Sequence, residues 1–326
     1  MSGASVPERA RLASLVRLML LARRFDERLI DLYKADQIPG WLHPHIGQEG
    51  VAVGVIAQLR EDDLLICGHR SHAHLLAKGV SPRKLAAEIL GRVDGLCGGR
   101  GGEVHLADVD RGCVQTTGIV GQQLPIALGA AFRIAYAAAG DRIAVCVFGD
   151  GAVGEGVAHE ALNLAAILKV PLLLVCENNG YSVGTRADLA SPGGDIARWA
   201  ASYGIPTYQV DGCDVLGTDA VAREAVERTR LQAGPVFLEC RVVRQLGHHM
   251  GDAQVYRAAE EIEAARQADV LPRFLAEAVQ HGIDTAEVAH LEADVEREVT
   301  DAIEFALASA HPSPSTLEEM LWAGDR

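Results

Sequence analysis

The sequence predicts an α/β fold with an open, mainly parallel sheet and helices on both faces. From residue 142 onward, short apolar runs such as RIAVCVF (142–148) and PLLLVCE (171–177) alternate with helical stretches. Apolar runs without polar alternation are typical of strands covered on both faces, and strand–helix–strand order implies parallel pairing. The 326 residues are 49% hydrophobic and only 23% charged, so a large core can form.

The expected elements follow in chain order. Helical periodicity predicts the first four helices at residues 8–33, 48–59, 82–90 and 125–139. Residues 91–105 contain six glycines, too many for a regular element, and predict an irregular loop. After the two strands above, IPTYQV (205–210) and PVFLECRVV (235–243) predict further strands, with a helix over 218–232 between them. From about residue 260 the chain returns to helix.

The domain organisation is expected to be simple. No internal repeat or low-complexity segment interrupts residues 1–326, which predicts one domain with an N-terminal helical segment (about 1–60) and a C-terminal helical tail (about 258–326). Arginines at helical spacing break the apolar stretches of the N-terminus, which therefore predicts a soluble helix rather than a signal peptide or a membrane span.

Charge and cysteine content narrow the function classes. The net charge of −14, from 30 basic and 44 acidic residues without a basic cluster, argues against nucleic acid and anionic membranes as partners. The seven cysteines include no C-x-x-C pair, and some lie within apolar strands. Reduced, mostly buried thiols in a cytoplasm are therefore expected.

Polar residues follow two of the predicted strands directly. Gly149, Asp150 and Gly151 end the first, and Asn178 and Asn179 end the second. Because ligand sites in parallel sheets form beyond the carboxyl ends of strands, Asp150 and Asn179 are expected to converge. A carboxylate and an amide oxygen, completed by ligand phosphates, suit Mg²⁺, and the helix expected to start near residue 156 can add its N-terminal dipole. Each signal alone is commonly an ordinary turn.

Together, GDG, an interval of about 26 residues and a double asparagine form the diphosphate-binding motif of thiamine-diphosphate enzymes. The resemblance extends over residues 17–262 and is carried by six blocks: HPHIGQEGVAVGV, GHRSHAHLLAKGV, GGRGGEVHLAD, GIVGQQLPIALGAA, FGDGAVGEGVAHEALNLAAILKVPLLLVCENNGYSVGT and GHHMGDAQVYRAAEEI. The chain resembles the alpha subunits of the 2-oxo acid dehydrogenase and acetoin dehydrogenase family. This implies the diphosphate-binding half of a thiamine-diphosphate-binding fold.

The resemblance also implies roles for individual residues. The metal ligands would be Asp150, the side chain of Asn179 and the backbone carbonyl of Tyr181. The residues that would contact the cofactor are His69, Arg70, Gly118, Val120, Gly149, Asp150, Gly151, Ala152, Asn179, Tyr181 and His248. The histidines at active-site positions are His43, His72, His105 and His248, of which His105 follows the glycine-rich loop and is the strongest candidate for proton transfer. Glu160 resembles an acidic residue at a subunit junction, although an exposed helical glutamate is the simpler interpretation.

The implied cofactors are thiamine diphosphate and Mg²⁺. The glutamate that activates the cofactor belongs to a beta chain in this family, which implies an alpha2beta2 heterotetramer that acts on a small carbonyl substrate and passes an acyl group to a lipoyl-bearing acyltransferase. The blocks GDAQVYR and GGDI (193–196) favour acetoin slightly, with pyruvate second and branched-chain oxo acids third. His249 stands where animal pyruvate enzymes carry a regulatory serine, which favours a bacterial cytoplasm.

Three alternatives stay open at this point. The segment GAVGEG after Asp150 departs from the sequence of many relatives. A related two-chain carboligase of a biosynthetic pathway is therefore one alternative. The glycines of FGDGAVGEG fit a dinucleotide-binding turn loosely, which would indicate an NAD-dependent dehydrogenase, although Asp150 would then face pyrophosphate without a metal. The third alternative is a noncatalytic scaffold homologue. An argument against it is that Asp150, Asn179, Arg70 and His248 are intact.

Overall fold

The computed structural model describes residues 8–137, 140–190, 195–231, 234–316 and 318. Its centre is a six-stranded, fully parallel sheet in the order β2-β1-β3-β4-β8-β7. The strands are β1 (Leu64–Cys67), β2 (Cys113–Thr116), β3 (Ala144–Gly149), β4 (Leu172–Asn178), β7 (Thr207–Asp211) and β8 (Val236–Arg241). A small antiparallel pair, β5 (Tyr181–Ser182) and β6 (Thr185–Arg186), follows β4.

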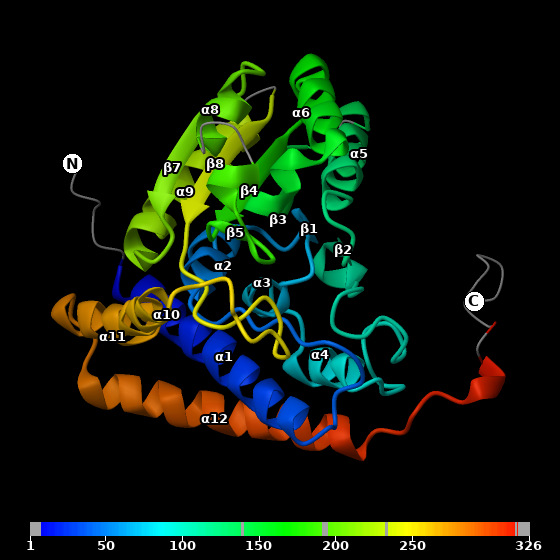
Figure 1. The fold of residues 1–326 in the computed structure, drawn as a ribbon, viewed down its shortest axis with the longest axis vertical. Coiled ribbons are helices and arrows are strands. Elements are labelled where there is room, and N and C mark those ends of the chain that lie inside the picture. The colour runs from blue at the N-terminus through cyan, green and yellow to red at the C-terminus, as the bar shows by residue number, and fades with distance from the viewer. Residues whose placement is uncertain (1–7, 138–139, 191–194, 232–233, 317, 319–326) are drawn as a thin grey trace.

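Helices surround this sheet and extend below it (Figure 1). In the first half of the chain they are α1 (Arg9–Lys34), α2 (Glu49–Ile56), α3 (His72–Ala77), α4 (Pro82–Ile89), α5 (Gln123–Tyr136) and α6 (Gly156–Leu168). In the second half they are α7 (Ala187–Ala190), α8 (Ile196–Ala201), α9 (Val215–Leu231), α10 (Ala259–Gln267), α11 (Val270–Gln280) and α12 (Thr285–Ala308). Short 3-10 helices occur at Val109–Arg111, Asp150–Gly154 and Pro314–Thr316.

Both faces of the sheet are buried, as the apolar runs predicted. Along β3, Val145 and Val147 belong to one hydrophobic core with residues of α1, α2 and α9. Their neighbours Cys146 and Phe148 belong to a second core with residues of α5, α6 and α8. Side chains of a strand alternate between its faces, so helices on both sides require apolar residues at every position.

The N-terminal and C-terminal helices pack together rather than extending freely. Figure 1 shows the long α1 and α12 side by side below the sheet, and the interface includes the buried Leu12 and Leu15 of α1 and Val295 and Val299 of α12. Among the described helices, none combines the length and hydrophobicity that a membrane crossing requires. All seven cysteines are free, and only Cys97 is not fully buried.

The fold class is confirmed, but several expected elements need correction. Strands β1 and β2 and helix α3 were absent from the expected set, because four-residue strands are too short to show a period. Helix α2 ends at Ile56 rather than Leu59, and α5 begins before Pro125 and ends at Tyr136. Ala137 caps α5. Residues 138–139 of the expected 125–139 helix, Gln232 of the 218–232 helix, part of GGDI and both extreme termini lie outside the described residues.

Candidate active site

A cavity of about 440 Å³ opens where the carboxyl ends of the central strands meet the surrounding loops. His69, Asp150 and Asn179 follow the carboxyl ends of β1, β3 and β4, respectively, and line the cavity. The other walls come from the loops at 39–43, 101–104 and 117–120 and from Arg244 and His248. The cavity therefore lies at the edge of the sheet where parallel-sheet ligand sites are expected.

Asp150 and Asn179 meet inside this cavity. Strands β3 and β4 are neighbours, and the backbone N–H of Asn179 donates to Oδ1 of Asp150 over 3.3 Å. Oδ2 of Asp150 is buried without a hydrogen-bond partner in the described residues, and the residue is only 6% exposed. Burial raises the pKa of Asp150 to about 6, since a buried carboxylate without a cation is poorly solvated.

Asn179 is oriented by its own contacts. Its side-chain Oδ1 accepts from the backbone N–H of Tyr181 over 3.1 Å, and its Nδ2 donates to Gln48 over 3.1 Å. These contacts fix the orientation of the amide and leave Oδ1 with a second lone pair for a further partner. Two oxygen donors on adjacent strand tips, one of them an unpartnered buried carboxylate oxygen, fit a hard divalent cation such as Mg²⁺.

Arg70 places a buried positive charge in the same cavity. It is 9% exposed, and no carboxylate among the described residues pairs with it. Its guanidinium donates to the carbonyl of Pro44 and, over 2.8 Å, to the carbonyl of His248. Burial, reinforced by the charge of Arg244, lowers the pKa of Arg70 to about 10. Arg70 is therefore not part of a surface salt bridge, and a buried cation without a carboxylate partner suits an anionic ligand.

Gly118, Ile119 and Val120 line one wall of the cavity immediately before α5. A side chain at Gly118 would contact Val104 and approach His105, so glycine keeps this wall close to the glycine-rich loop. Ile119 and Val120 are 63% and 48% exposed, although both are large and apolar. The cavity is thus bordered by hydrophobic residues that this chain leaves uncovered.

Residues 17–315 match the family model described as "Dehydrogenase E1 component". The chain belongs to the dehydrogenase E1 component family.

Curated relatives of this E1 family member carry two kinds of name. This chain is 38% identical over 300 residues to the acetoin:2,6-dichlorophenolindophenol oxidoreductase alpha subunit of Bacillus subtilis (strain 168), and the match covers 92% of this chain and 90% of the relative. It is 39% identical over 303 residues to the pyruvate dehydrogenase E1 component alpha subunit of Rhizobium meliloti (strain 1021), covering 92% and 87%. The Cupriavidus necator acetoin:2,6-dichlorophenolindophenol oxidoreductase alpha subunit is 39% identical over 306 residues, covering 93% and 90%.

All of the residues expected to contact the cofactor line the cavity of this E1 chain. They are His69, Arg70, Gly118, Val120, Gly149, Asp150, Gly151, Ala152, Asn179, Tyr181 and His248. The short 3-10 helix Asp150–Gly154 separates the cavity from α6, whose first turn does not line it. The first turn of α6 therefore does not reach the cavity, and a contribution of its dipole stays a prediction.

The expected catalytic histidines divide into two groups. His43 and His248 line the cavity, whereas His72 and His105 do not. His72 is buried behind the wall, with Nδ1 2.9 Å from Asp26. Burial lowers the pKa of His72, but the hydrogen bond and charge of Asp26 outweigh this and leave the pKa raised. His72 can thus act only through other groups.

His105 and Glu160 are both exposed, and neither lines the cavity. His105 lies beside the Gly118 wall, where the Cβ of a substituted Gly118 would be 3.9 Å from its ring. Glu160 lies on α6, away from the cavity. In this chain alone, neither side chain faces the cavity.

The sequence did not predict a buried network beneath the strand tips. Glu177, at the end of β4, places Oε1 3.0 Å from Nε2 of His45 and 3.1 Å from Nε2 of His74. Burial raises the pKa of Glu177, but the two histidines outweigh burial and lower it well below its usual range. The acidic residue directly before the double asparagine was the only sequence signal for this network.

Proposed function

We propose that this chain is the alpha subunit of a thiamine-diphosphate-dependent dehydrogenase component that acts on acetoin or pyruvate. The observation that carries the proposal is the pairing, in one cavity, of a carboxylate oxygen that needs a cation with a guanidinium that needs an anion. A magnesium diphosphate satisfies both requirements at once. A dinucleotide alone would leave Asp150 facing pyrophosphate without a metal, so the NAD-dependent alternative is not supported.

Asp150 and Asn179 would hold the Mg²⁺, with the carbonyl of Tyr181 as a further protein ligand. Arg70, His69 and His248 would bind the diphosphate oxygens, and the backbone of residues 149–152 would approach them closely. Thiamine diphosphate, when bound, supplies the electron sink for breaking the carbon–carbon bond of the substrate. The protein supplies the binding energy, the orientation and the exclusion of water.

Proton transfer at the cavity would be carried out by the histidines that can reach the cavity. Nδ1 of His43 contacts the carboxylate of Glu103, whose other oxygen accepts from the backbone N–H of His43 over 2.9 Å. This contact fixes the ring and leaves Nε2 available to accept a proton. His105 would join the site when the glycine-rich loop closes against a partner, since it lies next to Gly118.

The second chain of the complex would cover the apolar border of the cavity. Helices α5 and α6 lie side by side, and Phe132, Tyr136, Leu164 and Ile167 on them are exposed. This surface, here called the α5–α6 face, is continuous in sequence with Ile119 and Val120 at the cavity wall. A beta chain packed on the α5–α6 face would close the site, in keeping with the subunit names of the relatives.

The test is reconstitution. Thiamine diphosphate is expected to quench the fluorescence of Trp41, which lines the cavity, in a Mg²⁺-dependent manner. The chain alone is expected to be inactive with acetoin and pyruvate, and activity is expected only with a beta chain of this family. Transfer to a lipoyl-bearing acyltransferase would be followed as acyl-lipoyl formation. Full turnover by the isolated chain, or quenching by NAD in place of thiamine diphosphate, would refute the proposal.

A further inference from the structure

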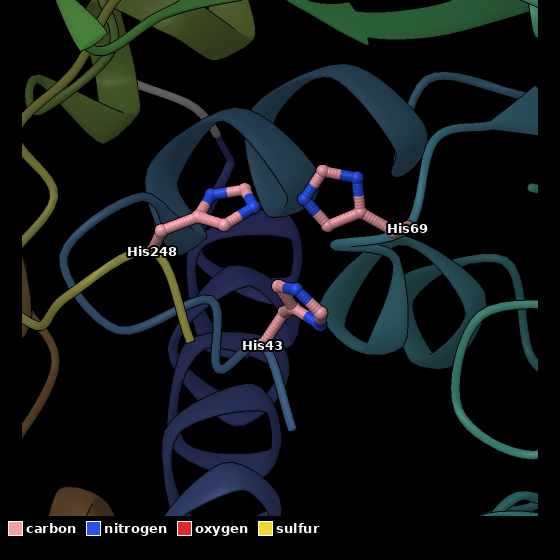
Figure 2. A group of neighbouring side chains, drawn as sticks. All are labelled: His43, His69 and His248. Atoms are coloured by element: carbon pink, nitrogen blue, oxygen red, sulfur yellow. The ribbon is translucent and has the colours of Figure 1, made fainter. Parts of the chain in front are cut away.

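We infer that His43, His69 and His248 form a binding site for a zinc-class divalent cation, separate from the oxygen ligands at Asp150 and Asn179. One nitrogen from each of the three rings lies within 4.8 Å of the others. Figure 2 shows the three rings turned toward one shared space, although they come from three separate loops. These loops follow α1, β1 and β8.

The ring arrangement matches that of a metal bound by three imidazoles. The ring centroids are 4.6 Å apart for His43 and His69, 5.0 Å for His43 and His248, and 5.2 Å for His69 and His248. Around tetrahedral zinc, with nitrogens about 2 Å from the metal, ring centroids lie about 5 Å apart. The rings are also tilted by 64°, 75° and 69° to one another, as rings arranged around one point are, rather than stacked.

The surroundings prepare these histidines as ligands. Glu103 holds Nδ1 of His43, and a carboxylate on the far nitrogen orients a metal-binding imidazole and makes it more basic. Burial, followed by the charge of Arg70, lowers the pKa of both other rings, to about 3 for His248. Lowering the pKa favours the neutral imidazole, which is the form that binds metals.

Nitrogen donors decide which cation fits. Mg²⁺ prefers oxygen, whereas imidazole suits Zn²⁺, Co²⁺, Ni²⁺ and Cu²⁺. All three histidines line the cavity, so the fourth position of the metal would be open to water or to a ligand oxygen. The nearby Arg70 repels a dication, so the affinity is expected to be lower than that of a closed structural zinc site.

A second group of potential ligands lacks this open position. His45, His74 and Glu177 are buried, and Oε1 of Glu177 already lies at hydrogen-bond distance from both rings. These hydrogen-bond distances explain the arrangement of the second group without a metal. The cavity trio, by contrast, has no hydrogen bond between its members among the described residues, although the rings are in contact.

The inference is tested with Co²⁺ on the full-length, tag-free and metal-free chain without cofactor. One equivalent is expected to bind with the visible absorption of four-coordinate Co²⁺, to be displaced by Zn²⁺ and to resist millimolar Mg²⁺. His69→Ala and His248→Ala are each expected to weaken binding at least tenfold, and Glu103→Gln about tenfold. Both histidines are partly exposed, and circular dichroism would verify that the variants fold.

Two controls separate this site from others. His290→Ala removes an exposed histidine of α12, and Asp150→Asn removes the charged oxygen ligand. Both are expected to retain one equivalent of Co²⁺ at unchanged affinity. Retention of that equivalent in the double variant His69→Ala/His248→Ala, its loss in either control, or displacement by Mg²⁺ would overturn the inference.

Discussion

The backbone N–H of Asn179 binds Oδ1 of Asp150, while Oδ2 of the same carboxylate has no partner among the described residues. The carboxylate is therefore positioned by the neighbouring strand but not neutralised by it. A cation beside Oδ2 would remove the solvation penalty that keeps the pKa of Asp150 near 6.

Asp150→Asn is predicted to stabilise the cofactor-free chain at pH 7.5 by about 1–3 kcal/mol. A raised pKa means that the folded state binds more protons than the unfolded chain between about pH 4 and 6, so the wild type loses stability as pH rises through this window. The asparagine is always neutral and keeps the contact with Asn179. Urea unfolding at pH 7.5 and pH 4.5 measures the difference, which should shrink at the lower pH. An equal difference at both values would contradict the argument.

The same substitution is predicted to abolish the Mg²⁺ dependence of thiamine diphosphate binding. Asp301→Asn, an exposed residue of α12 paired with Arg83, provides the matched control and should bind like the wild type. Calorimetric titrations with and without Mg²⁺ would measure both. Normal Mg²⁺-dependent binding by Asp150→Asn would exclude Asp150 as a metal ligand.

Arg70→Met is predicted to weaken thiamine diphosphate binding by about 100-fold while leaving thiamine binding nearly unchanged, because a buried charged contact to the diphosphate is worth about 3 kcal/mol. Arg70→Lys should recover only part of the loss, since lysine offers no planar fork. Comparing the affinity for thiamine with that for thiamine diphosphate distinguishes a lost diphosphate contact from a general distortion of the cavity. A similar loss for both ligands would indicate that Arg70 only supports the loops of Pro44 and His248.

The strand tips were predictable because parallel-sheet geometry converts sequence order into position. Asp150 and Asn179 each follow a buried apolar run, and one helix lies between those runs, so β3 and β4 were expected to be neighbours. The motif then predicted a magnesium diphosphate as the ligand at these tips. Gly118 and Arg70 required the family resemblance, since nothing in their local sequence places them at this edge.

The buried polar contacts were not predictable from one sequence. Asp26 in the middle of α1 contacts His72, and Glu103 in an irregular loop contacts His43. Each pair joins residues from separate elements, and its partner depends on how those elements pack. Strand β1 was not predicted because its four residues show no period. Strand β2 was not predicted because Gln115 and Thr116 interrupt its apolar character.

Glu177→Gln is predicted to destabilise the chain by about 3 kcal/mol at pH 7, because it removes one charge from a fully buried network. His45 and His74 would lose the carboxylate that both rings contact. Glu296→Gln, which changes a half-exposed residue 3.6 Å from Arg28, should alter stability by less than about 0.5 kcal/mol. Denaturant titration measures both, and equal effects would show that the network contributes no more than a surface ion pair.

Ile167→Glu is predicted to prevent assembly with the beta chain while preserving the fold of the isolated subunit. The side chain is exposed on the α5–α6 face, so the charge costs little in the free chain but would be buried in the complex. Leu231→Glu, at the exposed end of α9, is the control. Size-exclusion chromatography of each variant with the beta chain gives the result. Assembly by Ile167→Glu would place the partner on another surface.

Zn²⁺ is predicted to compete with thiamine diphosphate for the free chain. His69 and His248 are proposed contacts of the diphosphate and also two of the three nitrogen ligands, and a nitrogen that coordinates a metal cannot serve a phosphate oxygen. At fixed excess Mg²⁺, the apparent Kd of the cofactor should therefore rise in proportion to free Zn²⁺. In His43→Ala, which removes a metal ligand that is not one of the proposed diphosphate contacts, the wild-type cofactor affinity should persist and the Zn²⁺ effect should weaken at least tenfold. A Zn²⁺ effect that saturates below full displacement would instead indicate a ternary complex with a diphosphate oxygen at the fourth metal position.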